Sequence, residues 1–286
     1  MEKNKIEKAT LYLVGTPIGN LSDISERAKK VLSEVDFIAA EDTRNTYKLL
    51  SCYNIKKELV SYHEHNKHEG GERIIDRLLA GDCCALVTDA GMPAISDPGE
   101  DIVKKCVEMG ITVSVIPGAC AAISALALSG ISTSKFVFEG FLSANKGDRR
   151  KRLSEISNER RTLIFYEAPH KLKNTLADLE QTFGHTRRIS LCRELTKLNE
   201  EIIRTTIGGA IELYNEKEPR GEYVLILEGA DEAGIKLDNK SQEEDLTPFQ
   251  RVERYVFEGM SKMDAIKKTA KDLGVPKSKI YDLVSK

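Results

Sequence analysis

The sequence predicts an α/β protein with two α/β domains and a small helical module at the C-terminal end. Three observations predict this class. The chain has 286 residues, of which 41% are hydrophobic and 31% charged, which is ordinary for a globular protein of about two domains. Short apolar runs alternate with helical periodicity, as in sheets covered by helices. Two of these runs, at residues 11–20 and 87–99, break into turns rich in glycine and proline, as ligand loops do at the carboxyl ends of strands.

The first domain is predicted over residues 1–131. Each expected strand is a short apolar run bounded by turn residues, and the strands lie at residues 10–15, 36–40, 59–62, 83–88 and 112–116. Apolar residues at helical spacing separate them and predict helices at residues 24–33, 72–80 and 101–108. The alternation is typical of a doubly wound sheet.

The second domain is predicted over residues 132–230. Its expected strands lie at residues 136–139, 161–166, 187–192, 202–206 and 222–228, and its expected helices at residues 151–157, 171–182 and 207–214. Residues 231–246 have few large apolar side chains and many charges, which predicts a linker.

Residues 247–286 are predicted to form a helix-turn-helix-like module. Helical patterns occupy residues 248–258, 263–273 and 277–284, and Gly274 separates the last two. Residues 248–286 carry nine Lys or Arg and five Asp or Glu, so this segment is +4 and the remainder of the −2 chain is −6. A basic appendage favours nucleic acid as a partner, although a helical cap explains the pattern equally well.

The composition argues against a membrane, a disulfide framework and a metal site. No run of about 18 apolar residues occurs, and the first residues are charged, so we expect a cytoplasmic protein. The six cysteines show no CxxC spacing, which is the spacing expected of a zinc site. Residues 63–68, HEHNKH, place three histidines together without an evident fourth ligand, so we expect no metal.

The Gly/Pro-rich turns are the first candidates for ligand binding. Residues 15–19 lack both the GxGxxG and the GxxxxGK[ST] spacing, which argues against NAD, FAD and ATP. The second turn can present backbone carbonyl groups, together with Asp89 or Asp97, because its glycines and prolines permit unusual backbone angles. A third element, from Pro117 and Gly118 into a helix of small residues, allows a ligand or another backbone to come close.

Seven motifs in order resemble the tetrapyrrole methylase superfamily. They are LVGTPIGN at 13–20, AEDTR at 40–44, YHEHN at 62–66, DAGMPAISDPG at 89–99, IPGACAAISAL at 116–126, FYEAPHKL at 165–172 and CRELTK at 192–197. Within the superfamily they are similar to a branch that uses S-adenosylmethionine to methylate the ribose 2′-hydroxyl of a cytidine in the decoding region of 16S rRNA. The resemblance implies 16S rRNA or the small ribosomal subunit as partner, and a homodimer, which is usual in the superfamily.

The resemblance also implies that S-adenosylmethionine binds in a cleft between the two α/β domains. The positions that match the superfamily's cofactor contacts are Pro17, Asp89, Ala90, Gly91, Met92, Ile95, Cys120, Ala121, Tyr166 and Glu167. Met92 stands where an acidic residue is usual, and Asp89 is the expected replacement.

A ribose hydroxyl is a poor nucleophile, so the reaction calls for a positioned base. Acidic and histidine side chains next to the predicted strand ends are the candidates, and the sequence does not rank them: Glu41, Asp42, His63, Glu64, Glu167 and Glu194. Cations that could contact RNA phosphates are Arg44, Arg149, Arg150, Lys151, Arg152, Arg193 and Lys197. Four of them lie in the tract KGDRRKR at 146–152, which is either a phosphate-docking surface or a solvated face.

Two other functions remain open at this point. The first is methylation of a carbon atom of a tetrapyrrole or precorrin, although a soluble macrocycle needs neither the basic tract nor the basic C-terminal segment. The second is a DNA-binding regulator whose α/β part senses a ligand. The last predicted helix offers only Lys277, Ser278, Lys279 and Tyr281 to base edges, a small reading surface.

Overall fold

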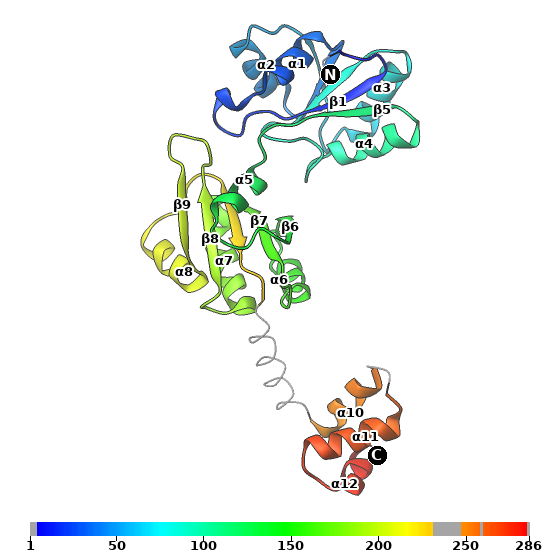
Figure 1. The fold of residues 1–286 in the computed structure, drawn as a ribbon, viewed down its shortest axis with the longest axis vertical. Coiled ribbons are helices and arrows are strands. Elements are labelled where there is room, and N and C mark those ends of the chain that lie inside the picture. Colours follow the sequence, from blue (N-terminus) through cyan, green and yellow to red (C-terminus); the bar gives the residue numbers. More distant parts are fainter. Residues whose placement is uncertain (1–4, 231–246, 258–259, 285–286) are drawn as a thin grey trace. The chain divides into compact units, whose positions relative to one another are not determined.

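The computed structural model describes residues 5–230, 247–257 and 260–284. These residues form two compact units, one ending at Gly229 and one beginning at Ala230 (Figure 1). The first unit contains two five-stranded sheets with their helices, and the second contains helices alone, so the predicted fold class is confirmed. The predicted linker at 231–246 lies outside the described residues, and the domain boundaries remain predictions.

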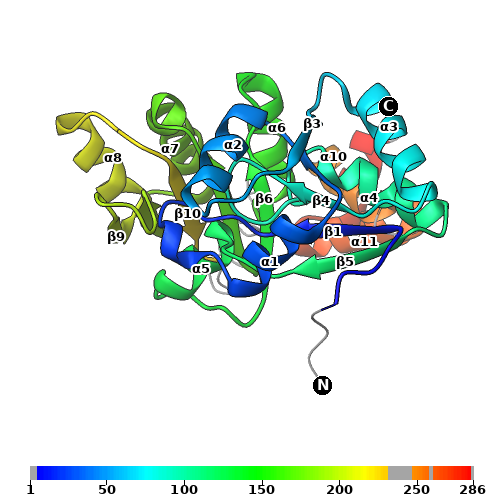
Figure 2. The same cartoon turned by 90° about the horizontal axis from the view of Figure 1, so that it is seen from above.

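The first sheet is entirely parallel, with strand order β3-β2-β4-β1-β5. Its elements, in chain order, are β1 (Thr10–Val14), η1 (Leu21–Asp23), α1 (Glu26–Glu34), β2 (Phe37–Ala40), α2 (Thr43–Cys52), β3 (Glu58–Ser61), α3 (Lys67–Leu79), β4 (Cys84–Val87), α4 (Gly99–Glu108) and β5 (Thr112–Ile116). Successive strand residues point to opposite faces. Ala85 and Val87 therefore pack with α1 and α2, whereas Cys84 and Leu86 pack with α3 and α4 (Figure 2).

The second sheet is mixed, with strand order β6-β7-β10-β8-β9. Its elements are β6 (Phe136–Phe141), α6 (Lys146–Glu155), β7 (Thr162–Glu167), α7 (Pro169–Phe183), β8 (Arg188–Arg193), β9 (Glu201–Thr206), α8 (Ile207–Glu216) and β10 (Tyr223–Leu227). Only the pair of β6 and β7 is parallel among these strands. Helices α6, α7 and α8 pack on one face.

Helix α5 (Ala121–Leu128) covers the other face of the second sheet. It follows directly after β5 of the first sheet, and Figure 1 shows it at the junction of the two α/β halves. Its buried residues Ala122, Ala125 and Leu126 contact the sheet residues Ile164, Cys192, Val224 and Ile226. A single helix therefore ties the strand ends of the first sheet to the second.

Several helix boundaries differ from those the sequence predicts. Helix α2 was not predicted, and of its ten residues it buries only Thr46 and Leu50, the first of which is polar. Helix α6 begins at Lys146 and not at residue 151, because the Asn145 side chain accepts hydrogen bonds from the backbone N–H groups of Gly147 and Asp148. The basic tract at 146–152 is therefore the first two turns of a helix.

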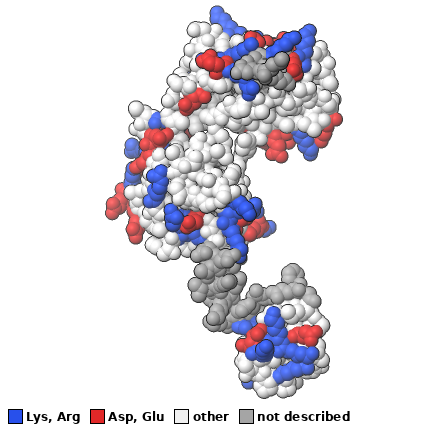
Figure 3. All heavy atoms as spheres, in the orientation of Figure 1, with Lys and Arg blue, Asp and Glu red and all other residues white. Residues whose placement is uncertain are grey.

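The second unit contains helices α10 (Pro248–Phe257), α11 (Lys262–Asp272) and α12 (Lys277–Val284). They enclose a small core of their own, which includes Val252, Tyr255, Ala265, Ile266 and Ile280. Figure 3 shows basic side chains gathered on one face of this unit, with acidic ones beside them. Within the described parts of both units, no helix combines the length and the apolar character needed to cross a membrane.

Candidate functional site

Three loops at the carboxyl end of the first sheet are bonded to one another. The backbone N–H of Thr16, after β1, donates to the carbonyl of Gly91, after β4, at 2.9 Å, and the N–H of Gly91 donates back to Thr16 at 3.2 Å. The N–H of Gly15 donates to Ile116, the last residue of β5, at 3.0 Å. The glycine and proline signals in the sequence therefore mark a single continuous rim.

Glycine is required where these loops cross. A Cβ atom on Gly15 would lie 2.6 Å from the Cα of Gly118, and real Cβ atoms do not approach backbone so closely. Gly91 has a φ of +87°, which disfavours other residues, and a Cβ there would meet the carbonyl oxygen of Ala119 at 3.2 Å. Glycine at these two positions therefore lets the loops of the rim pass close to one another.

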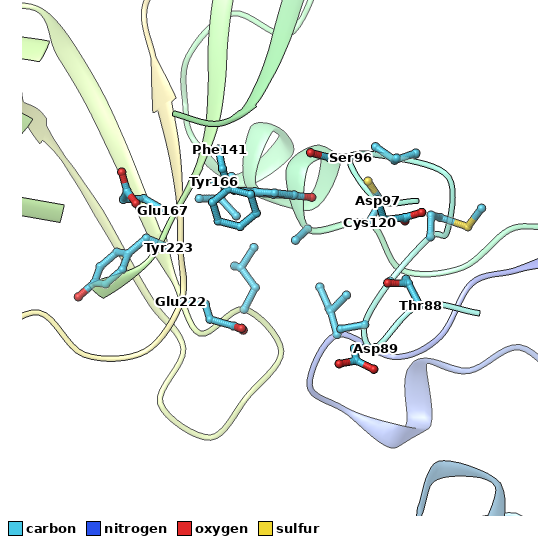
Figure 4. Close-up of a pocket in the computed structure, with 18 of the residues that line it drawn as sticks. Thr88, Asp89, Ser96, Asp97, Cys120, Phe141, Tyr166, Glu167, Glu222 and Tyr223 are labelled. Atoms are coloured by element: carbon cyan, nitrogen blue, oxygen red, sulfur yellow. The ribbon is translucent and has the colours of Figure 1, made fainter. Parts of the chain in front are cut away.

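A cavity of about 470 Å³, the main cavity, opens between this rim and the second sheet (Figure 4). The predicted cofactor residues Asp89, Ala90, Gly91, Met92, Ile95, Cys120, Ala121, Tyr166 and Glu167 all line it, and so do Glu41, Glu194 and Lys197. Pro17 instead lines a smaller neighbouring pocket of about 150 Å³. Among the residues that the sequence predicts, the structure thus brings together positions up to 156 apart, from Glu41 to Lys197.

Aromatic rings from the second sheet form the wall opposite the rim. The ring of Tyr166 lies 5.0 Å from that of Phe138, edge to face, and 5.4 Å from that of Phe141. Its hydroxyl accepts a hydrogen bond from the backbone N–H of Ala122, at the start of α5, at 3.2 Å. Burial raises the pKa of Tyr166, so it remains a neutral phenol at physiological pH.

Sequence reasoning missed several residues of the main cavity. They include Thr88, Ser96, Phe141, Leu195, Glu222, Tyr223 and Val224. One of them, Phe141, is a large aromatic residue at the end of β6 and is 59% exposed. An exposed aromatic beside a cavity offers apolar contact to a planar ligand.

Two carboxylates at the ends of neighbouring strands face the main cavity. Glu41, after β2, accepts a hydrogen bond from the Thr88 hydroxyl at 2.8 Å. Asp89, after β4, accepts one from the Asn45 side-chain amide at 3.2 Å. Partial burial, together with the charges of Glu41 and Asp42, raises the pKa of Asp89. Glu41 and Asp89 thus place two neighbouring carboxylates on one side of the main cavity.

Asp42 and His63, two predicted catalytic residues, do not line the main cavity. Asp42 caps α2, and its carboxylate accepts hydrogen bonds from the side chain and the backbone N–H of Arg44, which lower its pKa to about 2. A group with so low a pKa is a weak base. His63 lies after β3, where its backbone N–H donates to Asn66, and its Nδ1 atom is buried without a partner among the described residues.

Glu167 is among the residues that line the cavity, but its carboxylate is hydrogen-bonded within the second sheet's own helical layer. The carboxylate accepts hydrogen bonds from the Ala168 backbone N–H at 2.8 Å and from the Thr175 hydroxyl at 2.5 Å, and the residue is only 3% exposed. Figure 4 shows the side chain pointing away from the space between the two walls. The role of Glu167 in this structure is to hold the start of α7.

Lys197 and Glu194 form a charged cluster at the second-sheet side of the cavity. The Lys197 ammonium lies 2.9 Å from Glu194 and 2.8 Å from Glu222. Burial disfavours the charged lysine, but the two carboxylates outweigh it and raise the pKa of Lys197, while Lys197 lowers that of Glu194. Glu194 is therefore a paired anion, which makes it a poor proton acceptor.

Comparison with known proteins assigns the chain to a protein family. The family described as "Tetrapyrrole (Corrin/Porphyrin) Methylases" matches residues 10–211. The chain belongs to the tetrapyrrole methylase family. Within it, the chain is 50% identical to ribosomal RNA small subunit methyltransferase I of Halalkalibacterium halodurans, over 97% of this chain and 95% of the relative. It is 48% identical to the protein of the same name from Bacillus subtilis, over 97% and 94% of the two chains. It is thus a ribosomal RNA small subunit methyltransferase I homologue.

Solved structures confirm the fold of this tetrapyrrole methylase. A diphthine synthase aligns with a TM-score of 0.60 and 14% identity, over 77% of this chain and 90% of that one. Cobalt precorrin-4 methyltransferase aligns with a TM-score of 0.58 and 15% identity, over 77% and 95%. A uroporphyrin-III C-methyltransferase from Thermus thermophilus, solved with S-adenosylhomocysteine, aligns at 0.56 and 18% identity, over 77% and 97%.

Several cations predicted to contact RNA are held by the methylase's own carboxylates. Arg149 is 7% exposed, and its guanidinium lies 2.6 Å from Asp178, which Arg150 also contacts at 2.7 Å. Arg152 is paired with Glu139 and Glu155. For Arg149 the prediction of a phosphate contact is corrected, because the side chain is buried and also donates to the carbonyls of Ser143 and Ala144.

Of the other cations, some are held in ion pairs and others are exposed to solvent. Arg193 donates to the Arg220 carbonyl and pairs with Glu201 at 2.8 Å. Arg44 pairs with Asp42, but its side chain is 85% exposed. Within the described residues, no ion pair engages Lys146 or Lys151, and both side chains are exposed on α6. No group of three or more potential metal ligands occurs among the residues that the structure describes.

Proposed function

We propose that this chain transfers a methyl group from S-adenosylmethionine to the ribose 2′-hydroxyl of a cytidine in the decoding region of 16S rRNA. The similarity to ribosomal RNA small subunit methyltransferase I proteins over nearly the whole chain carries the proposal. The substrate is 16S rRNA, free or within the small ribosomal subunit, and the enzyme acts in the cytoplasm where ribosomes are made.

The main cavity suits S-adenosylmethionine. Its volume of about 470 Å³ lies within the range of about 300–1,000 Å³ that is usual for ligand sites. The small residues Ala90 and Gly91 line the cavity and leave room for close approach by the ligand, and Tyr166 and Phe141 offer apolar contact to an aromatic ring. When bound, the cofactor supplies a methyl group already activated by its sulfonium.

Because the cofactor supplies the activated methyl group, the protein must orient the acceptor hydroxyl and remove its proton. Holding the reacting atoms in line contributes roughly 7 to 11 kcal/mol to such reactions. Glu41 is the best-placed base, because its carboxylate lines the main cavity and its only described hydrogen bond comes from the Thr88 hydroxyl, which orients it. Asp42, Glu167 and Glu194 are each engaged in capping or ion pairing, as described above.

The homodimer expected from the superfamily is also part of this proposal. Helix α5 is apolar on all sides, and such a helix is usually buried all round. In a single chain, however, Ile123 is 49% exposed and Leu128 is 40% exposed. A second copy covering this face of α5 would remove both from water.

The deciding experiment maps ribose methylation in 16S rRNA. RNA from cells with and without the gene is digested and analysed by mass spectrometry, and purified protein with S-adenosylmethionine is then added to the unmethylated small subunits. We expect one 2′-O-methylcytidine to be absent from the deletion strain and to be restored by the protein. Methyl transfer to a tetrapyrrole and to no RNA would support the C-methyltransferase alternative.

A further inference from the structure

A second, smaller hollow adjoins the main cavity on the side of α2. The loop after β1 supplies Pro17 and Gly19 to this small pocket, α2 supplies Asn45 and Leu49, and the end of β4 supplies Thr88 and Asp89. Thr88 and Asp89 also line the main cavity, so the two spaces meet at these two residues. A ligand that occupies both spaces would have its junction beside Glu41, which is bonded to Thr88.

The volume of the small pocket limits what it can hold. At about 150 Å³ it is a third the size of the main cavity. A cavity of about this volume accommodates one six-membered ring such as benzene. The small pocket therefore has room for a single ring, and a fused pair of rings would project beyond it.

Two polar groups in the small pocket present a fixed pattern of donor and acceptor. The Asn45 Nδ2 atom donates to Asp89 Oδ2 at 3.2 Å, and both side chains are solvent-exposed and accessible to a ligand. An ionised carboxylate only accepts hydrogen bonds, so the amide nitrogen of Asn45, and not its oxygen, must face Asp89. Because an amide nitrogen carries two hydrogens, Asn45 keeps one N–H donor directly beside the acceptor oxygens of Asp89.

This donor–acceptor pair is complementary to one edge of cytosine. On its Watson–Crick edge, cytosine places the N4 amino donor beside the N3 acceptor, and carboxylates accept from cytosine N4 in protein–nucleic acid complexes. Uracil presents O4 and N3–H at the same positions, so it would place an oxygen against the carboxylate and a proton against the amide. Adenine shares the pattern of cytosine but carries a second ring.

Resting on the proposed ribose methylation, we propose that the small pocket takes the base of the target nucleotide and that Asn45 and Asp89 select cytosine. The target nucleotide is unstacked from its neighbours, as it is in other enzymes that must reach a single nucleotide. Its base packs between Pro17 and Leu49, and its ribose lies at the junction of the two cavities. The donor–acceptor pattern disfavours uracil, and the volume of the small pocket disfavours adenine.

The test measures methylation when the target base is changed. Small subunits are prepared with cytosine, uracil or adenine at the position that mass spectrometry identifies, and kcat/KM is measured for each. Wild-type protein should prefer cytosine over uracil by about 10- to 100-fold, the range for one well-placed bidentate base contact. Equal rates on cytosine and uracil would overturn the proposal.

The double variant Asn45→Asp with Asp89→Asn gives a sharper result. The exchange keeps one amide and one carboxylate in contact but reverses donor and acceptor, so the preference should shift toward uracil. If the double variant kept the wild-type preference for cytosine and methylated it at an unchanged rate, Asn45 and Asp89 would not be the residues that select the base. Ser51→Ala, on the same helix and outside both cavities, is the matched control.

Two further measurements distinguish a loss of base selection from a loss of cofactor binding and from failure to fold. Calorimetric affinity for S-adenosylmethionine, measured on each variant, shows whether a change in Asp89 has acted on the cofactor and not on the base. If the double variant does not fold, Asn45→Ala decides, because loss of the N–H donor should narrow the ratio of cytosine to uracil methylation. An absence of methyl transfer to any RNA by wild-type protein would instead reject the proposed function itself.

Discussion

The guanidinium of Arg149 lies 2.6 Å from the carboxylate of Asp178, with 9% of the arginine side chain and 4% of the aspartate side chain exposed. Arg149 belongs to α6 and Asp178 to α7, so the ion pair joins the first turn of one helix to the third turn of the next. Part of the basic tract at 146–152 thus stabilises the packing of α6 against α7 and does not face solvent.

Arg149→Ala should destabilise the protein strongly. Removing one partner of a buried ion pair leaves an uncompensated charge and costs about 3–5 kcal/mol. Lys151→Ala, two residues further along and exposed, should change the free energy of unfolding by no more than about 0.5 kcal/mol. Denaturant unfolding of both variants measures this, and similar stability losses would contradict the assignment of Arg149 as an internal residue.

The same ion pair predicts a specific pH dependence of stability. Burial works against the Asp178 carboxylate, but hydrogen bonds from Arg150 and Arg149 outweigh it and lower its pKa below the usual 3.8. A carboxylate with a lowered pKa stabilises the folded state above the unfolded pKa, and this contribution is lost as the pH falls through the folded value. The stability gap between wild type and Asp178→Asn should therefore be largest near neutral pH and should narrow in acid. A gap independent of pH would contradict this cause.

Much of the fold could be predicted because its central strands, such as β2, β4 and β10, are buried on both faces and read as continuous apolar runs between turn residues. Helix α2 escaped prediction because only Thr46 and Leu50 of its ten residues are buried. The start of α6 escaped because it depends on the Asn145 cap and not on apolar periodicity. Local polar interactions of this kind leave a weak pattern in a single sequence.

The residues of the candidate site also differ in how far the sequence predicts them. The rim could be predicted because the glycines that permit its close backbone contacts are visible in the sequence, as at Gly15 and Gly91. Arg149 and Lys151 could not be told apart, because the difference between them is Asp178, 29 positions from Arg149. Glu222 and Phe141 enter the cavity from the second sheet, and nothing in their sequence neighbourhood indicates which way they face.

Gly91→Ala should reduce the affinity for S-adenosylmethionine by at least about 10-fold. The added Cβ meets the Ala119 carbonyl and Ile18 at 3.2 Å and pushes on the rim where the cofactor is proposed to bind. Gly81→Ala is the matched control, because its φ of +103° imposes a comparable backbone cost while the space around it is open. Calorimetry should show weaker binding only for Gly91→Ala, and equal affinities would argue against a cofactor at the rim.

Glu41→Gln should lower the rate of methyl transfer by about 10²- to 10⁴-fold, the usual contribution of a positioned base. Cofactor affinity should change little, because the substitution keeps the size of the side chain and its hydrogen bond with the Thr88 hydroxyl. Asp42→Asn is the control, because asparagine also caps helices well and Asp42 does not face the main cavity. A slower reaction in Asp42→Asn than in Glu41→Gln would reverse the assignment of the base.

Lys146 and Lys151 are exposed on α6 and, among the described residues, are engaged in no ion pair, so they are the best remaining candidates for contact with RNA phosphates. Changing both to Ala should weaken RNA binding irrespective of sequence and reduce the slope of log affinity against log salt by roughly 1 to 2, since each phosphate contact adds about 0.7 to 0.9 to that slope. Melting temperature and cofactor affinity should stay unchanged. An unaltered salt slope would identify this face of α6 as merely solvated.

Removal of the C-terminal helices tests whether they bind RNA or stabilise the catalytic unit. Helices α10, α11 and α12 have a hydrophobic core of their own, and the two sheets belong to a separate compact unit, so a chain ending at residue 245 should fold and bind S-adenosylmethionine normally. Because residues 248–286 carry nine basic and five acidic side chains, we expect the shortened chain to bind small subunits more weakly and with a smaller salt slope. Calorimetry, thermal unfolding and RNA binding are measured on both forms. A large drop in the melting temperature of the sheet unit, with RNA affinity unchanged, would assign these helices a structural role and remove them from the RNA-binding surface.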